Sequence, residues 1–344
     1  MPVRYPAPLN PGDRIGVTAP SSGVPDALRP RLDLAVRTLR DRGFEVIVGE
    51  CIGDGDGIVS APAADRAAEL AAMLLDPTIR AVVPPWGGEL AVEVLPLLPW
   101  SDLAAAEPTW LVGYSDLSTL TLALTLRSGV ATLHGQNLLD TPYAVPSPLL
   151  AWTDVLSRPT GSSVVQGAST HHRLRDHDDW VADPAVAALT LDTPGRWSLL
   201  DPGAGPLRVR GRLLGGCIET VGILAGTPYG DVPAFAAEHA GDGVVLHLEA
   251  GGDGAVDIAR DLWRMRLAGW FDVADAVLVG RTRAPASGAF TQVDAVRSAL
   301  AGLDVPVALD VDCGHVPPHL ALVDGAVAEV TVDGDEQAIV QHLV

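Results

Sequence analysis

Short apolar runs alternate with longer amphipathic segments along the first part of the chain. The apolar runs, each about the length of one β-strand, lie at 14–19, 44–50, 79–86 and 109–114. The segments between them carry apolar residues at helical spacing and lie at 26–42, 63–76, 88–98 and 116–127. Strands that alternate with helices in this way predict a parallel sheet covered by helices on both faces.

The pattern changes in the second half of the chain. Residues 142–206 are rich in proline, glycine and polar residues, which breaks the alternation. Beyond them, strand-like segments lie at 207–216, 241–250, 274–283, 305–314 and 325–334, and helical patterns at 217–225, 255–269 and 289–302. We therefore expect an α/β protein with three parts. These are a Rossmann-like N-terminal domain with a parallel sheet over 1–165, a loop-rich connection over 166–206, and a smaller β-rich α/β C-terminal domain over 207–344.

Composition narrows the classes of function. The 344 residues are 48% hydrophobic and 19% charged, which is typical of a folded globular protein rather than a disordered one. The formal net charge of -20 would repel nucleic acid and anionic lipid surfaces, so neither is expected as a partner. The first strand-to-helix turn lacks the G-x-G-x-x-G pattern of dinucleotide-binding folds.

The N-terminal stretch and the spacing of the cysteines indicate the compartment and the state of the thiols. The N-terminal stretch has no apolar core of signal-peptide length, and no apolar run is long enough to span a bilayer, so we expect a cytoplasmic protein. Cys51, Cys217 and Cys313 lie far apart without C-x-x-C spacing, which predicts free buried thiols.

One serine lies on a strand-to-helix turn, a position that is typical of catalytic nucleophiles. Ser115 follows the strand 109–114 and precedes the helix 116–127, in "GYSDLSTL". A side chain on such a turn lies above the carboxyl ends of the strands, beside the free N–H groups of a helix N-terminus. Ser115 is therefore either a nucleophile or a helix cap, because serine is also a preferred N-cap residue.

A nucleophilic serine needs a base and an orienting carboxylate. The C-terminal half offers both at strand ends: Glu249 in "LHLEA" and His315 in "DVDCGHVPP". Taken singly, Glu249 could be a solvated charge at a strand end and His315 a turn histidine. Together with Ser115 they form a complete set for nucleophilic catalysis.

These three segments, in this order, resemble the serine LD-carboxypeptidase family, which includes the microcin C immunity peptidases. Further stretches carry the resemblance along nearly the whole chain: "LNPGDRIGVTAPSS", "PWGGELAVEVLPLLPW" and "GRLLGGCIETVGILAGTPYGD". The resemblance implies a Rossmann-like domain and a β-rich domain with a site between them, a homodimer, and neither a metal nor an organic cofactor.

The resemblance also implies roles for individual residues. Ser115 would be the nucleophile, His315 the general base and then acid, and Glu249 the carboxylate that holds the imidazole. The oxyanion hole would use the backbone N–H groups of Asp116 and Gly88.

The resemblance leaves two classes of substrate open. The chain looks closest to the microcin C immunity branch, which would mean a small peptide or aminoacyl-nucleotide substrate. The alternative is the murein branch, which cleaves tetrapeptides in cell-wall recycling. Trp180, in a tryptophan-bearing insertion with Trp197, could stack on a nucleobase or simply anchor a loop. Apolar residues at 90–92 depart from the small polar residues that the immunity branch tends to carry.

Other classes of function stay open from the residues alone. An α/β-hydrolase shares the order Ser, acid, His, but its elbow needs glycine where Leu117 stands. A thiol enzyme could use Cys313 or Cys217. A binding protein that has lost catalysis could keep the fold. The loop "HHRLRDHDDW" could hold a metal or be a solvated polar loop; its ligand-type residues are His171, His172, Asp176, His177, Asp178 and Asp179.

Overall fold

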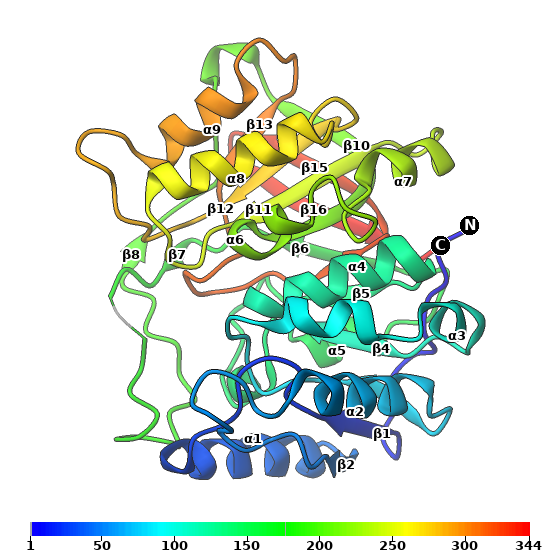
Figure 1. Ribbon diagram of the computed structural model, residues 1–344. Helices are drawn as coiled ribbons and strands as arrows, with labels where there is room; N and C mark the ends of the chain where they lie inside the picture. Colours follow the sequence, from blue (N-terminus) through cyan, green and yellow to red (C-terminus); the bar gives the residue numbers. More distant parts are fainter. Residues whose placement is uncertain (1, 176) are drawn as a thin grey trace.

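The computed structural model describes residues 2–175 and 177–344, which form two α/β units stacked on one another (Figure 1). The first unit contains a six-stranded sheet in the order β2-β1-β3-β4-β5-β14. Strands β1 to β5 are parallel, and β14 joins the edge antiparallel to β5. The strands are β1 Arg14–Val17, β2 Glu45–Val48, β3 Ile79–Val82, β4 Trp110–Gly113, β5 Thr132–His134 and β14 Leu322–Asp324.

The longer helices α1 and α2 of this unit each bury one face, whereas α4 is buried on nearly all sides. In α1 the buried apolar residues Leu32, Val36 and Leu39 recur at helical spacing, as the sequence pattern predicts. The segment 88–98 forms a 3-10 turn instead of an α-helix, and Pro96 lies inside it. The helical elements are η1 Asp26–Leu28, α1 Arg29–Asp41, α2 Ala63–Leu75, η2 Ala91–Leu97, α3 Trp100–Ala105, η3 Ser115–Leu117, α4 Ser118–Ser128, η4 Leu138–Asp140 and α5 Trp152–Leu156.

The second unit is an eight-stranded mixed sheet in the order β6-β16-β15-β10-β11-β12-β13-β9. Its centre, β10 to β13, is parallel, and β11 and β12 are buried along their whole length. Near-continuous apolar runs are typical of such central parallel strands. The strands are β6 Ser163–Gly167, β9 Ser198–Leu199, β10 Leu207–Cys217, β11 Val244–Glu249, β12 Ala276–Gly280, β13 Val307–Val311, β15 Val327–Asp333 and β16 Glu336–His342.

The α-helices of the second unit are α6 to α9. Figure 1 shows α8 and α9 side by side over the same part of the sheet, and both bury an apolar face. The predicted helix 289–302 begins in the structure with a capping box on Thr291, which explains its start. The helices are α6 Ile218–Val221, α7 Val232–Glu238, α8 Ala255–Leu267 and α9 Gln292–Leu300.

Two strands cross between the parts that the sequence pattern separates. β6 spans the expected boundary at 165 and pairs with β16 of the second sheet. β14 comes late in the chain, yet it pairs with β5 of the first sheet. The connection also holds a small two-stranded sheet, β7 His171–His172 with β8 Thr193–Pro194. The chain therefore ties the two units together by strand exchange as well as by linkers.

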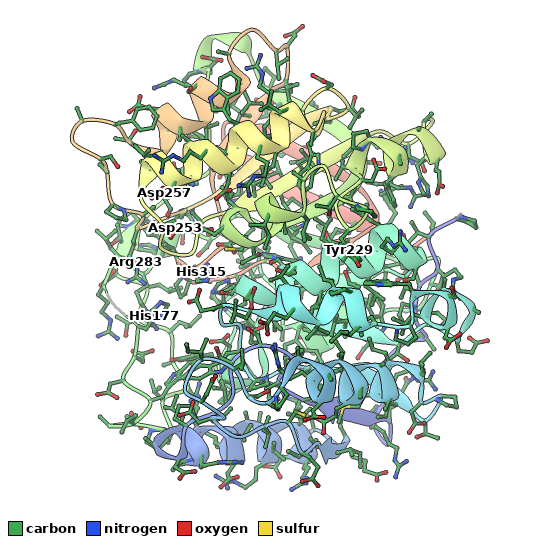
Figure 2. The ribbon with its side chains drawn as sticks, in the orientation of Figure 1. His177, Tyr229, Asp253, Asp257, Arg283 and His315 are labelled. Atoms are coloured by element: carbon green, nitrogen blue, oxygen red, sulfur yellow. The ribbon has the colours of Figure 1, made fainter. Side chains whose placement is uncertain are left out.

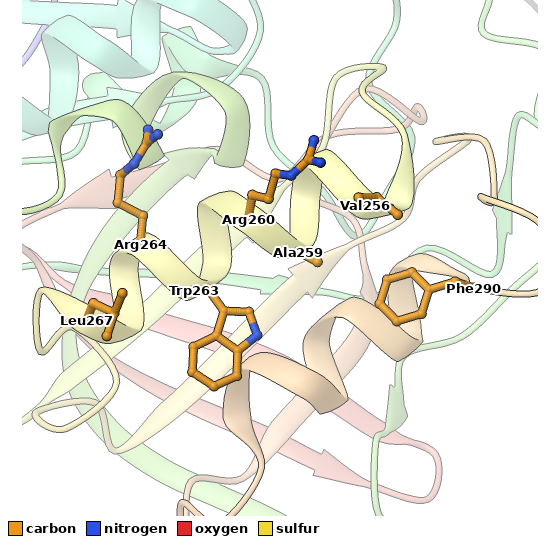
Figure 3. A pocket seen from close by; sticks show the side chains of 7 residues that line it. All are labelled: Val256, Ala259, Arg260, Trp263, Arg264, Leu267 and Phe290. Carbon is orange, nitrogen blue, oxygen red and sulfur yellow. The ribbon is translucent and has the colours of Figure 1, made fainter.

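The helices of the described ranges are too short or too polar to cross a membrane. A surface cavity of about 530 Å³ lies along α8, lined by apolar and arginine side chains that include Trp263, Leu267 and Phe290 (Figure 3). It contains none of the residues singled out in the sequence for chemistry.

Candidate active site

Ser115 lies on a strained turn between β4 and α4. Its φ angle is 66°, a left-handed backbone conformation that a residue with a side chain rarely adopts. The chain enters the turn through Gly113, where a Cβ would lie 2.4 Å from Leu117 Cδ1, so only glycine fits there. The N-caps of η3 and α4 are Tyr114 and Leu117, and neither turn nor helix has a side-chain cap. Ser115 is therefore not a helix cap.

Glu249 ends β11 and is completely buried. Two glycines make room for its side chain: a Cβ on Gly280 would lie 2.7 Å from Glu249 Cβ, and one on Gly314 would lie 2.8 Å from its Oε2. The solvated strand-end charge considered from the sequence is excluded by this burial. A buried carboxylate needs a hydrogen-bond partner. Its Oε1 has none among the described residues, so Oε2 must provide the contact.

His315 reaches Ser115 because its loop crosses between the two sheets. The loop leaves β13 of the second sheet and ends at β14 of the first. β14 pairs with β5, and β5 pairs with β4, the strand that carries Ser115 at its end. Figure 2 shows His315 at the boundary between the two units. The crossing thus delivers an imidazole from the second unit to the serine of the first.

The three side chains form one hydrogen-bonded series. His315 Nε2 lies 3.0 Å from Ser115 Oγ, and its Nδ1 lies 2.7 Å from Glu249 Oε2. The backbone N–H of His315 also donates to Glu249 Oε2, at 3.3 Å. With Nδ1–H donating to the carboxylate, Nε2 is the free acceptor that a general base requires.

Burial and charge act in opposite directions on this pair. Burial lowers the pKa of His315, but the charge of Glu249 and its hydrogen bond outweigh burial, so the pKa lies above its ordinary value. Burial raises the pKa of Glu249, yet the charge of His315 and the hydrogen bond outweigh it, and the pKa is lowered. The carboxylate is therefore ionised at neutral pH and stabilises an imidazolium.

Two glycines leave open space in front of the serine. A Cβ on Gly87 would lie 2.9 Å from both Ser115 Oγ and the backbone N of Asp116. Gly88 follows with a φ of 146°, and a Cβ there would lie 2.2 Å from Ser22 Oγ. Both glycines line the cavity in front of Ser115, and the oxyanion role of Gly88 stays a prediction.

The carboxylate of Asp116 holds the surrounding loops rather than facing the cavity. Its Oδ2 accepts hydrogen bonds from Ser21 Oγ at 2.5 Å and from the backbone N of Ala91 at 2.7 Å. Burial raises its pKa, and these hydrogen bonds offset part of that rise. Asp116 thereby fixes the segment after Gly88 against the serine turn.

A cavity of about 470 Å³ opens in front of the triad. Trp86 and Trp180 line it, together with Asp140 and Asp178. Trp180 also donates its indole N–H to Tyr143 Oη at 2.8 Å and packs against the core, so it is both a loop anchor and part of the cavity wall. Its stacking on a base stays a prediction.

The cysteines do not suit a thiol enzyme. All three are free and buried, as expected from the sequence, and burial raises the pKa of Cys217 and of Cys313 well above the ordinary value. A nucleophilic cysteine needs the opposite shift. The Sγ atom of Cys217 donates to Glu219 Oε2 at 3.0 Å.

The metal-binding alternative has little support in the polar loop. Asp178 is held by Arg173 at 2.7 Å, and Asp179 caps a turn; Asp176 lies outside the described residues. Over 2–175 and 177–344, the one group of three or more ligand-type side chains close enough for an ion is Cys217, Glu249 and His315, within 4.8 Å of one another. Two of these are already joined by the short hydrogen bond of the triad.

Sequence reasoning missed several residues of the site. Gly87 has a sequence signal, because "WGGEL" contains two adjacent glycines after a strand. Tyr114, whose ring centroid lies 5.0 Å from that of His315, directly precedes Ser115 in "GYSDLSTL", but the motif assigns it no role. Asp140, on the turn after β5, carries no motif, and only its position at the carboxyl end of a parallel strand could have indicated it.

Two models of known families match this chain. The model of the LD-carboxypeptidase N-terminal domain matches residues 15–135, and that of the C-terminal domain matches residues 210–330. The chain belongs to the LD-carboxypeptidase family. The resemblance noted in the sequence is thereby confirmed, and the protein is a serine hydrolase of the carboxypeptidase type.

Relatives within the LD-carboxypeptidase family carry two kinds of name. A protein named as a carboxypeptidase from Streptomyces coelicolor is 30% identical over 334 residues, covering 95% of this chain and 93% of its own. The microcin C7 self-immunity protein MccF of Escherichia coli is 24% identical and covers 98% and 95%. The murein tetrapeptide carboxypeptidase of Pseudomonas aeruginosa is 27% identical and covers 73% and 71%.

Solved structures of the LD-carboxypeptidase family show the same fold. MccF in complex with glutamyl sulfamoyl guanosine superimposes with a TM-score of 0.82 at 20% identity, covering 98% of both chains. An MccF-like protein from Bacillus anthracis gives a TM-score of 0.78 at 19% identity, covering 98% of this chain and 99% of the other. The predicted α/β fold, with a Rossmann-like unit and a β-rich unit, is confirmed by this likeness.

Proposed function

We propose that this enzyme hydrolyses an amide bond in a small peptide or aminoacyl-nucleotide substrate through Ser115, His315 and Glu249. The observation that carries the proposal is the series of two hydrogen bonds, 3.0 Å from Ser115 Oγ to His315 Nε2 and 2.7 Å from His315 Nδ1 to Glu249 Oε2. The left-handed backbone of Ser115 supports it, because such strain clusters at nucleophile turns.

The reaction would run in two steps. Ser115 Oγ attacks the scissile carbonyl carbon while His315 Nε2 takes the hydroxyl proton, and Glu249 stabilises the imidazolium. His315 returns that proton to the leaving amine as the C–N bond breaks and an acyl-enzyme remains. Water then attacks the ester carbon while His315 takes one of its protons. The C–Oγ bond breaks, His315 returns the proton to Ser115 Oγ, and the acid is released.

The oxyanion of each tetrahedral intermediate would accept hydrogen bonds from the backbone N–H groups of Asp116 and Gly88. The space beside Gly87 supports this placement, since it lies in front of the Asp116 nitrogen and next to Ser115 Oγ. Preorganised donors of this kind usually supply a large part of the rate enhancement.

The aminoacyl-nucleotide class is supported by the cavity wall and by the relatives. Trp86 and Trp180 both line the cavity, and an aromatic ring can stack on a nucleobase. MccF binds glutamyl sulfamoyl guanosine and aspartyl sulfamoyl adenosine. The second candidate is a murein tetrapeptide, which the 27% identity to a murein tetrapeptide carboxypeptidase supports.

One assay tests the reaction and separates the two substrates. Wild-type protein and Ser115→Ala are each incubated with an aminoacyl sulfamoyl adenosine and with a murein tetrapeptide, and the products are measured by mass spectrometry. We expect the wild type to hydrolyse the sulfamoyl adenosine faster, and Ser115→Ala to hydrolyse neither. Equal hydrolysis by both proteins would contradict the proposal, and faster cleavage of the tetrapeptide would favour the second candidate.

The setting belongs to the same proposal. We expect a cytoplasmic homodimer that needs no metal or organic cofactor and binds neither nucleic acid nor membranes. Light scattering on the purified protein tests the dimer, and full activity after exhaustive dialysis against a chelator tests the absence of a metal requirement.

A further inference from the structure

One carboxylate in the cavity has no cationic partner. Asp140 lies at the end of η4, on the turn that follows β5, and it lines both the main cavity and a smaller one of about 20 Å³ behind it. Its Oδ2 accepts a hydrogen bond from the backbone N of Asn137 at 3.3 Å. Within the described ranges, no arginine or histidine nitrogen lies within ion-pair distance of its carboxylate.

The charges of Arg31 and Arg173 lower the pKa of Asp140, but neither guanidinium forms an ion pair with its carboxylate, and Arg31 Nη2 is buried without a hydrogen-bond partner among the described residues. Arg31 donates to the carbonyl oxygens of Leu139, Pro184 and Val186 at 2.8, 3.0 and 2.6 Å, and its guanidinium is stacked on the ring of Tyr143 at 4.7 Å. The second acid of the cavity, Asp178, differs from Asp140 because it forms ion pairs with two arginines.

Asp178 is neutralised within the protein. It receives hydrogen bonds from Arg173 at 2.7 Å, from Arg175 at 3.0 Å and from Tyr143 Oη at 2.7 Å. These contacts lower its pKa although burial alone raises it. Asp178 therefore holds the loop in place, whereas Asp140 leaves a carboxylate available to a ligand.

Asp140 is also close enough to the triad to contact the substrate. Ser115 and Asp140 follow β4 and β5, which are neighbouring parallel strands, and both line the same cavity. The charge of Asp140 contributes to the raised pKa of His315. Burial raises the pKa of Asp140 itself to about 6, so the group is ionised at neutral pH and would gain from a cation beside it.

The remaining lining has little that could bind an anion. Its described side chains include no arginine and no lysine, and the titratable groups other than acids are His177, His315 and Tyr114. A ligand carboxylate would face an unpaired acid there, whereas a ligand ammonium would find a partner.

We propose that Asp140 binds a primary ammonium group of the substrate, so that the enzyme selects substrates with a free amine on the acyl side of the scissile bond. The inference rests on the proposed function for the position of that bond. Two substrates supply the same chemistry: the α-ammonium of an aminoacyl nucleotide, and the distal ammonium of diaminopimelate in a murein tetrapeptide.

The test compares ligands that differ only in the amine. Alanyl sulfamoyl adenosine is paired with propionyl sulfamoyl adenosine, and the murein tetrapeptide with its analogue containing 2-aminopimelate in place of diaminopimelate. Dissociation constants are measured by calorimetry on the Ser115→Ala protein, which cannot turn the ligands over, with and without Asp140→Asn. Asp154→Asn, which makes the same charge change on the exposed surface of α5, is the matched control.

We expect the amine-bearing member of one pair to bind about tenfold more tightly or better, which is a typical effect of one partly buried charge pair. The ratio of the two dissociation constants in that pair falls at least fivefold in Asp140→Asn and is unchanged in Asp154→Asn. The pair that responds identifies the source of the ammonium. Asparagine keeps the acceptor for the Asn137 N–H, and thermal unfolding checks that the variant is folded.

Equal affinity for both members of each pair in protein that retains Asp140 would overturn the inference, as would a ratio that survives Asp140→Asn or an absence of binding by all four ligands. These readouts do not depend on catalysis. Failure of the proposed function would be seen in the hydrolysis assay instead, as identical products from wild type and Ser115→Ala.

Discussion

In the proposed reaction, Ser115, His315 and Glu249 depend on one another, and none of them acts alone. The serine hydroxyl is weakly nucleophilic until His315 accepts its proton, and the imidazole holds the right tautomer only while Nδ1 donates to Glu249. Their roles follow from contacts between residues up to 200 positions apart in the sequence.

Removal of either reacting group should abolish turnover. We expect Ser115→Ala and His315→Ala to lower kcat by about 10⁴-fold or more, and the double variant to be little worse, because the groups act as a unit. Steady-state kinetics on the preferred substrate measures this. Ser101→Ala, on the exposed surface of α3, is the control and should keep wild-type kinetics.

Filling the space beside the serine should impair the oxyanion hole. A methyl group at Gly87 would lie 2.9 Å from the Asp116 nitrogen and 2.9 Å from Ser115 Oγ. We expect Gly87→Ala to lower kcat by about 10²- to 10³-fold, the usual effect of losing one oxyanion donor. Gly241→Ala is the control, because a Cβ there meets no atom within 4 Å. Unchanged kcat in Gly87→Ala would contradict the proposal that the oxyanion binds beside Gly87.

The pH profile should report the base. His315 accepts a proton only when neutral, so kcat/KM should fall as the pH drops below its raised pKa, which lies above 6.5. Glu249→Gln removes the charge that raises this pKa, so the acidic limb should shift to lower pH while kcat falls by about 10²- to 10⁴-fold. An acidic limb that stays in place would mean that another group controls it.

Sequence motifs could reveal the triad residues but not their surroundings. The serine turn and the two strand ends have recognisable local patterns. Asp140 lies in the mixed polar and apolar stretch 134–142, which carries no motif, and its proposed role depends on which charged groups the fold places near it. Gly87 likewise owes its importance to its closeness to Ser115 Oγ and the Asp116 nitrogen, which lie on another loop.

At the level of elements, β14 determines whether the site exists. It is three residues long, Leu322–Asp324, and completes the first sheet although it follows β13 of the second. Such a short strand has too few positions for a period-two pattern, so the sequence does not reveal it. The longer strands β10, β11, β12, β13 and β15 are predicted correctly, because continuous apolar runs or alternation mark them.

A buried pair holds β14 in place. His247 Nε2 on β11 lies 2.7 Å from Asp324 Oδ1 on β14, and both side chains are fully buried. We expect Asp324→Ala to lower the free energy of unfolding by about 1–3 kcal/mol, since it leaves a buried imidazole nitrogen without a partner. Asp324→Asn keeps an acceptor and should cost less. Urea unfolding of both variants measures the difference, and equal losses would contradict this role of the pair.

At the level of the whole molecule, both units contribute to the proposed site, because neither contains all three of Ser115, His315 and Glu249. The first supplies Ser115 and the backbone of Gly87 and Gly88, and the second supplies Glu249 and leads the chain to His315. Alternation and composition predict both units from the sequence. Their relative position could not be predicted, because it follows from strand exchange and from buried contacts such as Cys217 N to Ser118 Oγ at 3.1 Å.

The most direct test of the central claim is covalent labelling of the intact protein with a fluorophosphonate, followed by mass spectrometry of its peptides. The account predicts one adduct, on Ser115, that is lost in Ser115→Ala and strongly slowed in His315→Ala. An adduct on another residue, or no adduct in wild-type protein that is folded and otherwise intact, would contradict it.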